Sequence, residues 1–327
     1  MSDPTWPSVS VVMPVLNEQE HLEAAVQSVL AQNYPGSLDI CLALGPSTDG
    51  TDEIAQRLVA SDSRVRTVAN PTGGRSSGLN SAIRSTQGSL VVRVDAHSSL
   101  PTGYISRAVE TLLRTSAANV GGVQRAVGHS EFEKAVAVAL ASPFGMGGAR
   151  YRTGGSEGPV DTVFLGVFDR AAIEAVGLFD ESVVGNEDYE LNIRLRQSGR
   201  VVWFDPALAV DYVPRSSFRA VRRQFFQYGA WKRRVVQLHP NSVQPRQVAP
   251  PIVLMSIVAA LIVSPWMPIA LLAPGAYVAG VIVLSVGLGR SPRRIATLAA
   301  VFPTMHMAWA LGFLVGERRT TRTAPPR

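Results

Sequence analysis

The chain has 327 residues, of which 46% are hydrophobic and 17% charged, with a formal net charge of +6 and one cysteine. This length suffices for one sizeable α/β domain with an accessory region. The sequence shows no repeat period, so it is not a repeat array. The single cysteine, Cys41, lies in an apolar run, so it predicts a core residue and excludes a disulfide framework or a cysteine metal cluster within the chain. The polar N-terminus has no apolar signal segment, so we expect the first domain to stay in the cytoplasm.

The first part of the chain alternates predicted strands with predicted helices, joined by short polar links. This alternation predicts an α/β fold with a doubly wound, mainly parallel sheet. Asn17, with Glu20 at capping-box spacing, is expected to cap the first helix. Strands are expected over residues 8–15, 37–45, 64–69 and 89–95, and further helices over residues 52–60 and 75–86.

Polar residues directly follow each predicted strand, which is where ligands bind in doubly wound sheets. Asp95 and His97 follow the fourth strand, and in extended geometry their side chains would share one face, about 7 Å apart. Such a pair suits a divalent cation, whereas the alternative is a loop-capping aspartate beside a surface histidine. Asp49 could contact a nucleoside or form an Asx turn, and turn use is the commoner role. Arg75 could contact a phosphate or lie exposed to solvent at the start of a helix. The remaining polar groups are Asn17 with Glu18, residues 47–51 and residues 70–75.

Five segments stand out, in the order VSVVMPVLNE, GPSTDGT, NPTGGRSSGLNSAI, VDAH and GNEDYELNIRLRQSG. In this order, over about residues 8–235, they resemble the motifs of inverting family-two glycosyltransferases of the GT-A fold. The D-A-H form is similar to that of bacterial succinoglycan-type and exopolysaccharide glucosyltransferases that associate with membranes. The resemblance implies an α/β GT-A domain that transfers a hexose from a nucleotide diphosphate sugar, expected to be UDP-linked, to an acceptor hydroxyl with inversion.

The resemblance also implies roles for particular residues. It implies that Asp95 and His97 bind Mn²⁺ or Mg²⁺, that Asp188 is the catalytic base, and that Glu187 orients the loop beside it. From the residues alone, Glu187 and Asp188 more commonly cap a helix, in whose first turn the ionised form of an aspartate is favoured. The implied nucleotide-sugar-binding residues are Pro14, Asn17, Glu18, Ser47, Asp49, Arg75 and Asp95.

Departures from the family pattern leave alternatives open. Residues 44–46 read Leu-Gly-Pro where the family carries D-D-G, so a carboxylate expected at the nucleoside is missing, and His97 replaces the second acid of D-x-D. One alternative function is a nucleotidyltransferase on a related fold, and another is a non-catalytic membrane assembly subunit with a degenerate glycosyltransferase domain. Asn186 and Glu190 are the polar alternatives to the proposed base.

Seven cations and no acid lie between Arg215 and Arg234, with aromatic residues interleaved among them. Because a very apolar region follows, a basic amphipathic helix on an anionic membrane surface explains this order better than a nucleic-acid partner does. Gln224, Tyr228 and Trp231 are expected on the acceptor or membrane side of this helix. The segment lacks the Q-x-x-R-W motif of processive synthases, which favours a single sugar addition.

Three apolar segments, over residues 249–264, 269–288 and 295–316, predict two or three transmembrane or re-entrant helices. If all three cross the membrane, the basic clusters at 289–294 and 317–322 fall on opposite sides, against the positive-inside tendency. The first segment is short and flanked by prolines, so it is the best candidate for a re-entrant or interfacial segment.

These observations predict a membrane-anchored glycosyltransferase with its catalytic domain on the cytoplasmic face of the inner (plasma) membrane. Its expected partners are a nucleotide diphosphate sugar, a lipid-linked or glycan acceptor and the anionic membrane surface, with no nucleic acid. The expected parts are a GT-A catalytic domain (1–214), a basic interfacial segment (215–247), two or three membrane helices (248–316) and a basic polar tail (317–327).

Overall fold

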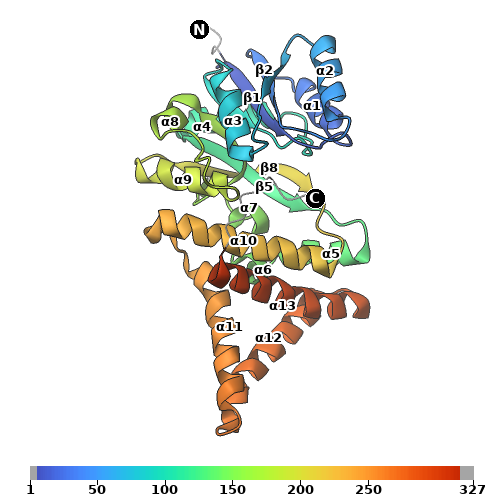
Figure 1. Ribbon diagram of the computed structural model, residues 1–327, viewed down its shortest axis with the longest axis vertical. Coiled ribbons are helices and arrows are strands. Elements are labelled where there is room, and N and C mark those ends of the chain that lie inside the picture. Colours follow the sequence, from blue (N-terminus) through green and yellow to red (C-terminus); the bar gives the residue numbers. More distant parts are fainter. Residues whose placement is uncertain (1–5, 317–327) are drawn as a thin grey trace. The chain divides into compact units, whose positions relative to one another are not determined.

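The computed structural model describes residues 6–316 (Figure 1). The described chain divides into two compact units, of which the first contains residues 6–124 and 154–211 and the second residues 125–153 and 212–316. The expected boundaries after residues 214 and 247 stay predictions, and the expected polar tail lies outside the described residues.

The first unit is built on a mixed, mainly parallel sheet, which confirms the expected α/β class. Among the described residues the sheet has eight strands in the order β3-β2-β1-β4-β7-β5-β8-β6. Strand β1 pairs in parallel with β2 and β4, and β2 pairs in parallel with β3, whereas β7 is antiparallel to β4 and β5. The strands are β1 (Val9–Val15), β2 (Leu38–Leu44), β3 (Val65–Ala69), β4 (Leu90–Arg93), β5 (Asn119–Ala126), β6 (Gly158–Pro159), β7 (Phe164–Asp169) and β8 (Val202–Tyr212).

Helices follow the parallel strands in the predicted alternation. Each predicted helix up to residue 86 is present, and a helix begins at Glu187 as the N-E-D-Y segment indicates. The helices of this unit are α1 (Leu22–Leu30), α2 (Thr51–Ser61), α3 (Arg75–Arg84), α4 (Tyr104–Thr115), α8 (Arg170–Ala175) and α9 (Glu187–Gln197).

The expected capping role of Asn17 is wrong. Helix α1 begins at Leu22 after His21, with no side-chain cap. Asn17 instead adopts a left-handed conformation with φ of 54°, and its Oδ1 accepts a 2.8 Å hydrogen bond from the Thr48 amide. Asparagine tolerates this conformation better than most residues, so its side chain reaches the neighbouring loop instead of the helix.

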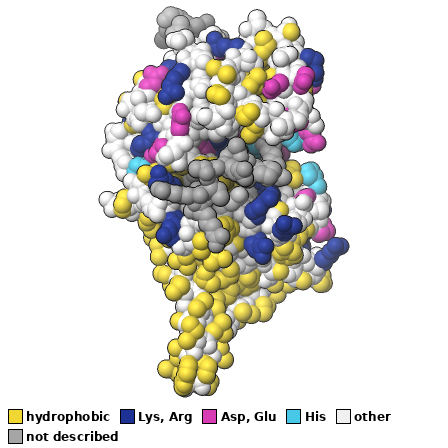
Figure 2. Space-filling model, in the orientation of Figure 1, with side chains coloured by type: hydrophobic (Ala, Val, Ile, Leu, Met, Phe, Trp, Pro, Cys, Tyr) yellow, Lys and Arg dark blue, Asp and Glu magenta, His cyan; other side chains and the backbone are white. Residues whose placement is uncertain are grey.

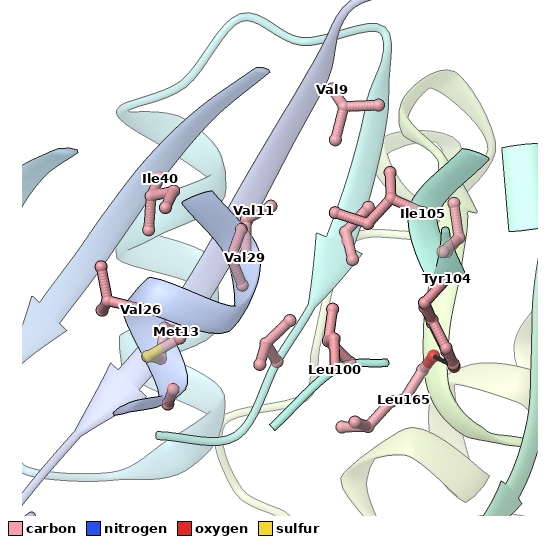
Figure 3. Packing of buried hydrophobic residues seen from close by; sticks show 14 of the residues in the cluster. Val9, Val11, Met13, Val26, Val29, Ile40, Leu100, Tyr104, Ile105 and Leu165 are labelled. Carbon is pink, nitrogen blue, oxygen red and sulfur yellow. Dashed lines mark hydrogen bonds between the residues drawn. The ribbon is translucent and has the colours of Figure 1, made fainter. Parts of the chain in front are cut away.

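Strand β1 is buried on both faces because helices cover the sheet on either side. Its alternate residues Val11 and Met13 pack with Val26 and Val29 of α1 in one core cluster (Figure 3). Val12 points to the other face, in a cluster that also contains residues of α3 and α9. Cys41 is fully buried in this second cluster, as predicted. The loops after the parallel strands are therefore held on a rigid edge.

The second unit is helical. Helices α10 and α13 run side by side, and α11 and α12 form a hairpin that projects from them (Figure 1). Core residues of α5, α10 and α13 form one apolar cluster. The helices are α5 (Glu131–Ala141), α6 (Pro143–Met146), α7 (Arg150–Thr153), α10 (Phe218–Leu238), α11 (Pro245–Val263), α12 (Leu272–Leu288) and α13 (Pro292–Val315).

Three helical segments are long and apolar enough to cross a membrane, by length and composition. They are Pro245–Val263, Pro268–Leu288 and Pro292–Val315. This finding indicates membrane association. The first segment begins at Pro245, earlier than expected, and its 19 residues extend about 28 Å at 1.5 Å per residue, so it is not too short to span.

Candidate functional site

The loops after β1 and β2 are joined by hydrogen bonds. Besides the Asn17 bond to Thr48, the Asn17 amide donates to Ser47 Oγ at 3.1 Å, and the Glu18 amide donates to Thr51 Oγ1 at 2.8 Å. The predicted donor-binding residues Asn17, Glu18 and Ser47 therefore belong to one hydrogen-bonded edge of the sheet.

Asp49 and Pro14 lie at the same edge. Asp49 Oδ1 accepts from the Thr51 amide at 3.2 Å and from Thr51 Oγ1 at 2.5 Å, which is the Asx-type turn use foreseen as its alternative. Burial tends to raise the pKa of Asp49, but these hydrogen bonds from Thr51 hold it below its usual value. Pro14 lies within β1 opposite Ala43, and Gly78 of α3 approaches it closely.

A buried arginine joins the two predicted acidic motifs. Arg93, at the end of β4, donates through Nη2 to Asp95 Oδ1 at 3.2 Å and to Glu187 Oε1 at 2.9 Å. Arg75, at the start of α3, donates through Nη1 to the same Glu187 oxygen at 3.2 Å. Arg93 and Glu187 are almost completely buried, whereas the Arg75 side chain is 44% exposed. The residues near position 95 and near position 187 are thus brought together, although 92 positions separate Asp95 from Glu187 in the chain.

The two arginines set the ionisation of this cluster. Burial alone would raise the pKa of Asp95, but Arg93 and Arg75 hold it at about 2. Burial opposes ionisation of Glu187 in the same way, and the guanidinium groups of Arg75 and Arg93 again lower its pKa. Both carboxylates are therefore charged at neutral pH, and with the two arginines their formal charges sum to zero.

Asp188 differs from its neighbour. It lies in the first turn of α9, half-buried, after Asn186 in a left-handed conformation with φ of 60°. Burial raises the pKa of Asp188 above its usual value, and the nearby Glu187 charge adds to this, while Arg93 acts in the opposite direction. The sequence led us to expect that the helix dipole would favour the ionised form, but burial and the adjacent carboxylate outweigh it.

Asp95 and His97 do not alternate along a strand as expected. Strand β4 ends at Arg93, and the Ser98 amide donates to the Asp95 carbonyl at 2.8 Å, so Asp95 and His97 lie in a turn. The His97 Nδ1 atom lies 3.2 Å from Glu18 Oε1. This contact links the D-A-H segment to the loop after β1.

Asp95 and His97 supply ligand types that a divalent cation accepts, but they supply only part of its ligand set. A carboxylate hydrogen-bonded to one ring nitrogen of a metal-binding histidine fixes the tautomer and orientation of the ring, and Glu18 would do this for His97. Both side-chain bonds from Arg93 reach Oδ1 of Asp95, and neither takes Oδ2. Among residues 6–316, however, no three His, Cys, Asp or Glu side chains are grouped so as to hold a metal ion. A cation here would need further ligands, such as phosphate oxygens.

Gln224, Tyr228 and Trp231 lie on α10 in the second unit. Gln224 Nε2 donates to Tyr212 Oη at 2.9 Å, and the Tyr228 and Trp231 rings are 6.0 Å apart. Burial raises the pKa of Tyr228 to about 12, so its hydroxyl is neutral. The Arg152 guanidinium lies 5.0 Å from the Tyr212 ring centre and is buried, and within residues 6–316 its Nε and Nη1 have no hydrogen-bond partner.

Arg93, an arginine within a predicted strand and so expected to be paired at its edge, was given no role in the site by the sequence analysis, and Arg152 was given no role either. Arginine is almost never buried without a partner, so Arg93 within the apolar run V-V-R-V, two positions before Asp95, was a usable signal. Arg152 had no such signal because its surroundings are contributed by a distant strand and helix. The Thr51 hydroxyl was also missed as the group that joins the two donor-side loops.

Comparisons with known proteins identify the family of this chain. Residues 10–177 match the family described as Glycosyl transferase family 2. The chain is 33% identical over 316 residues to the succinoglycan biosynthesis protein ExoA of Rhizobium meliloti (strain 1021), covering 94% of each chain. A second relative, 24% identical over 68% of this chain and 72% of its own, is the Dolichyl N-acetyl-alpha-D-glucosaminyl phosphate 3-beta-D-2,3-diacetamido-2,3-dideoxy-beta-D-glucuronosyltransferase of Methanococcus voltae.

One solved structure is similar over most of the chain. It is the mannosyltransferase PcManGT from Pyrobaculum calidifontis, solved in complex with GDP-Man and Mn²⁺. Its TM-score is 0.65 at 22% identity, and the match covers 95% of this chain and 88% of the other. At this identity the likeness establishes the fold, which is the expected GT-A type with C-terminal apolar helices.

Proposed function

The chain belongs to glycosyl transferase family 2, and from this premise we propose that it transfers one hexose from a nucleotide diphosphate sugar to a lipid-linked acceptor with inversion. As a family member it is a glycosyltransferase that uses a nucleotide sugar, so the nucleotidyltransferase and non-catalytic hypotheses are set aside. The expected donor is a UDP-hexose, and the product is expected to enter exopolysaccharide assembly, as the name of the Rhizobium relative suggests.

The observation that carries the proposal is the Arg93 bridge. Because one guanidinium donates to both Asp95 and Glu187, the donor-side carboxylate and the start of α9 are held within one buried cluster. Asp188 is the next residue along α9, close enough for the charges of Arg93 and Asp95 to affect its pKa. A sugar held between these two places would have a leaving diphosphate on one side and a base on the other.

Asp188 is our proposed base. The acceptor hydroxyl oxygen attacks the anomeric carbon, the bond from that carbon to the diphosphate breaks, and the hydroxyl proton moves to the Asp188 carboxylate. The nucleoside diphosphate leaves with the bonding electrons, and because the hydroxyl attacks from the opposite face, the anomeric configuration is inverted. A raised pKa suits this role, because a general base works best when its pKa approaches the operating pH.

The donor is assigned to the edge formed by the loops after β1 and β2, through Pro14, Asn17, Glu18, Ser47 and Asp49. Asp95 and His97 would hold Mn²⁺ or Mg²⁺, with Glu18 orienting the imidazole, and the bound cation would neutralise the leaving diphosphate. Arg75 would add a further positive charge near the phosphates. The Pyrobaculum mannosyltransferase, which was solved with GDP-Man and Mn²⁺ bound, supports both the metal and the use of GDP-mannose as a comparison donor.

The lipid-linked acceptor is assigned from the second unit. The orphaned nitrogens of buried Arg152, beside Tyr212 and near Gln224, Tyr228 and Trp231, fit an anionic group such as the phosphate of a prenyl-linked sugar. The dolichyl phosphate named for the Methanococcus relative supports the same class of acceptor. The catalytic unit would act at the cytoplasmic face of the inner membrane.

The proposal is tested with detergent-purified full-length protein, UDP-hexoses and GDP-mannose, Mn²⁺ and a prenyl-diphosphate-linked sugar. We expect nucleoside diphosphate release that depends on the acceptor, and a glycosidic product whose anomeric configuration, read by NMR, is opposite to that of the donor. A product with the configuration of the donor would overturn the proposed inversion.

Two variants test the assignments within the same assay. Arg152→Met should raise KM for the lipid-linked acceptor while KM for the donor stays near the wild-type value. Arg57→Met, at an exposed arginine of α2, is the matched control for general effects of replacing an arginine by methionine. If sugar transfer to a soluble acceptor without lipid were as fast as transfer to the lipid-linked acceptor, the proposed lipid-linked acceptor would be wrong.

A further inference from the structure

We propose that only α11 and α12 cross the bilayer, as a hairpin, and that α13 lies along the membrane surface between this hairpin and helices α5 and α10. Three helices have the length and composition of membrane spans, but they differ in their surroundings within the second unit. The inference rests on the membrane association of the chain and not on the chemistry of sugar transfer.

The hairpin has the properties of a membrane-embedded element. From Gln247 to Gly289 the sequence contains no Asp, Glu, Lys or Arg. In the most apolar stretches of α11 and α12 only 11% of the residues are buried, so large hydrophobic side chains face outward. Figure 2 shows this apolar surface below a level at which Lys and Arg side chains gather. Water-exposed proteins rarely carry so large an apolar surface, and a bilayer is the partner that fits it.

The tip of the hairpin suits the far interface of the membrane. Trp266, between α11 and the short turn that begins at Pro268, is 81% exposed. Tryptophan is enriched at the boundary between hydrocarbon and water, and the uncharged tip could reach that boundary. The segment Pro268–Leu288 has 21 residues, or about 31 Å of helix, which matches the hydrocarbon thickness of about 30 Å.

Helix α13 is buried by protein to a far greater extent. In its most apolar stretch 39% of the residues are buried, against 11% in the other two segments. Its contact with α10 is close enough to require glycine on both helices. A Cβ on Gly229 would lie 2.0 Å from the Trp309 carbonyl oxygen, and a Cβ on Gly312 would lie 2.0 Å from the Phe226 carbonyl oxygen.

This pairing fixes the depth of α13, because α10 cannot enter the hydrocarbon. Helix α10 carries three cations in its first half and three in its second half, and charged side chains are strongly disfavoured at the bilayer centre. A spanning α13 would carry the attached α10 across with it. The cations of α10 are Arg219, Arg222, Arg223, Lys232, Arg233 and Arg234.

Both ends of α13 are also tied to charged helices. Near its start, Arg294 Nη2 donates to Glu131 Oε2 of α5 at 3.0 Å. Near its end, Arg233 Nη1 of α10 donates to the Phe313 carbonyl at 3.3 Å. A spanning helix would have to leave one of these partners on each side of the membrane. A helix that lies flat keeps both partners at the headgroup level.

The arrangement also resolves the conflict between the basic clusters at 289–294 and 317–322. With two spans, the chain returns to its starting side before residue 290, and α13 keeps it there, so both clusters share one side as the positive-inside tendency requires. The cluster at 317–322 lies outside the described residues, and only its charge is used for the positive-inside tendency. The interfacial segment is therefore the last of the three, and not the first as the sequence suggested.

Site-specific labelling of single-cysteine variants tests the topology. The native Cys41 is fully buried and burial raises its pKa to about 11, so the wild-type chain serves as an unlabelled background. Cysteine is introduced at Ser63, Trp266, Arg290 and Val315, and membrane vesicles of both orientations are treated with a membrane-impermeant maleimide. Ser63 marks the side of the catalytic unit.

We expect Ser63→Cys, Arg290→Cys and Val315→Cys to be labelled in the same vesicles, and Trp266→Cys only in vesicles of opposite orientation. Leu314→Cys, which is also exposed, replaces Val315→Cys if that variant does not reach the membrane. Labelling of residues 290 and 315 from opposite sides would show that α13 spans. Labelling of Trp266→Cys from the Ser63 side, or extraction of the protein by alkaline carbonate, would likewise overturn the proposal.

Discussion

Glu187 and Asp188 are neighbours in the chain, yet their environments shift their pKa values in opposite directions. Glu187 accepts hydrogen bonds from Arg75 and Arg93, which keep it ionised despite its burial. The pKa of Asp188 is raised by burial and by the charge of Glu187. Adjacent carboxylates with separated pKa values commonly mark an acid or base assignment. The local sequence therefore indicates both carboxylates as candidates, and their surroundings distinguish them by shifting their pKa values in opposite directions.

The pH dependence of the reaction should report Asp188. The base must be ionised, and burial favours its protonated form, so kcat/KM is expected to fall as pH decreases through a pKa above the ordinary aspartate value of about 3.9. Asp188→Asn should remove this acidic limb and lower kcat by about 10²- to 10⁴-fold. A pH profile unchanged in Asp188→Asn would exclude this residue as the base.

The same pair should show opposite effects on stability. Because the folded-state pKa of Asp188 is raised, its ionisation opposes folding as pH rises through that value, and Asp188→Asn should leave Tm unchanged or higher at pH 7. The folded-state pKa of Glu187 is lowered, so its contribution is present at neutral pH and is lost as pH falls through that lowered value. Glu187→Gln should cost about 3–5 kcal/mol, because it leaves Arg93 with a broken buried ion pair. Thermal unfolding at pH 7 in detergent measures both, and equal Tm changes would contradict the assignment.

At the scale of elements, the loops after β1 and β2 act as one unit. Asn17 contributes through two features, since its side chain accepts from the Thr48 amide and its backbone is left-handed. Thr51, at the start of α2, accepts from the Glu18 amide and donates to Asp49. The proposed donor-binding edge thus takes its parts from two consecutive strand-to-helix connections.

Substitution of Asn17 should separate its two features. Asn17→Ala loses the hydrogen bond and strains the left-handed backbone, so we expect a loss of about 1–2 kcal/mol in unfolding free energy and a higher donor KM. Asn17→Gly loses only the hydrogen bond and should recover part of the stability but not the donor KM. Denaturant unfolding and donor titration measure the two effects, and identical Ala and Gly variants would mean that the backbone conformation has no energetic role.

At the scale of the whole molecule, the charge balance of the site bears on metal binding. The formal charges of Arg75, Arg93, Asp95 and Glu187 sum to zero, so the two arginines offset the attraction of these two carboxylates for a free cation. A nucleotide diphosphate adds negative charge and oxygen ligands, and should therefore bind together with the cation. The apolar hairpin of α11 and α12 gives the same chain a means of membrane association.

Thermal-shift measurements should reveal this linkage. We expect Mn²⁺ alone to change Tm little, UDP alone to raise it modestly, and the two together to raise it by more than the sum, because each ligand stabilises the folded state by mass action. Asp95→Asn should abolish the excess, whereas Asp52→Asn should retain it. A large response to Mn²⁺ without nucleotide would contradict the inferred charge balance.

Much of this protein follows from local sequence patterns. The alternation of strands and helices, the burial of Cys41, the polar loops after the parallel strands and the apolar C-terminal helices are all set by residues close in the chain, so their periodicity predicts them. The five motifs, in order, predicted the family. Local patterns also placed Glu187 and Asp188 at the start of a helix.

Other features were decided by tertiary structure alone. The pairing of Arg93 with Glu187 and the direction of the Asp188 pKa depend on side chains contributed by other elements. The bond between Asn17 and Thr48 joins two loops and replaces the expected helix cap. The surroundings of α13 likewise separate it from two helices of similar composition. Sequence periodicity measures how apolar a segment is, but only packing determines whether protein or lipid covers it, and that distinction decides what each segment does.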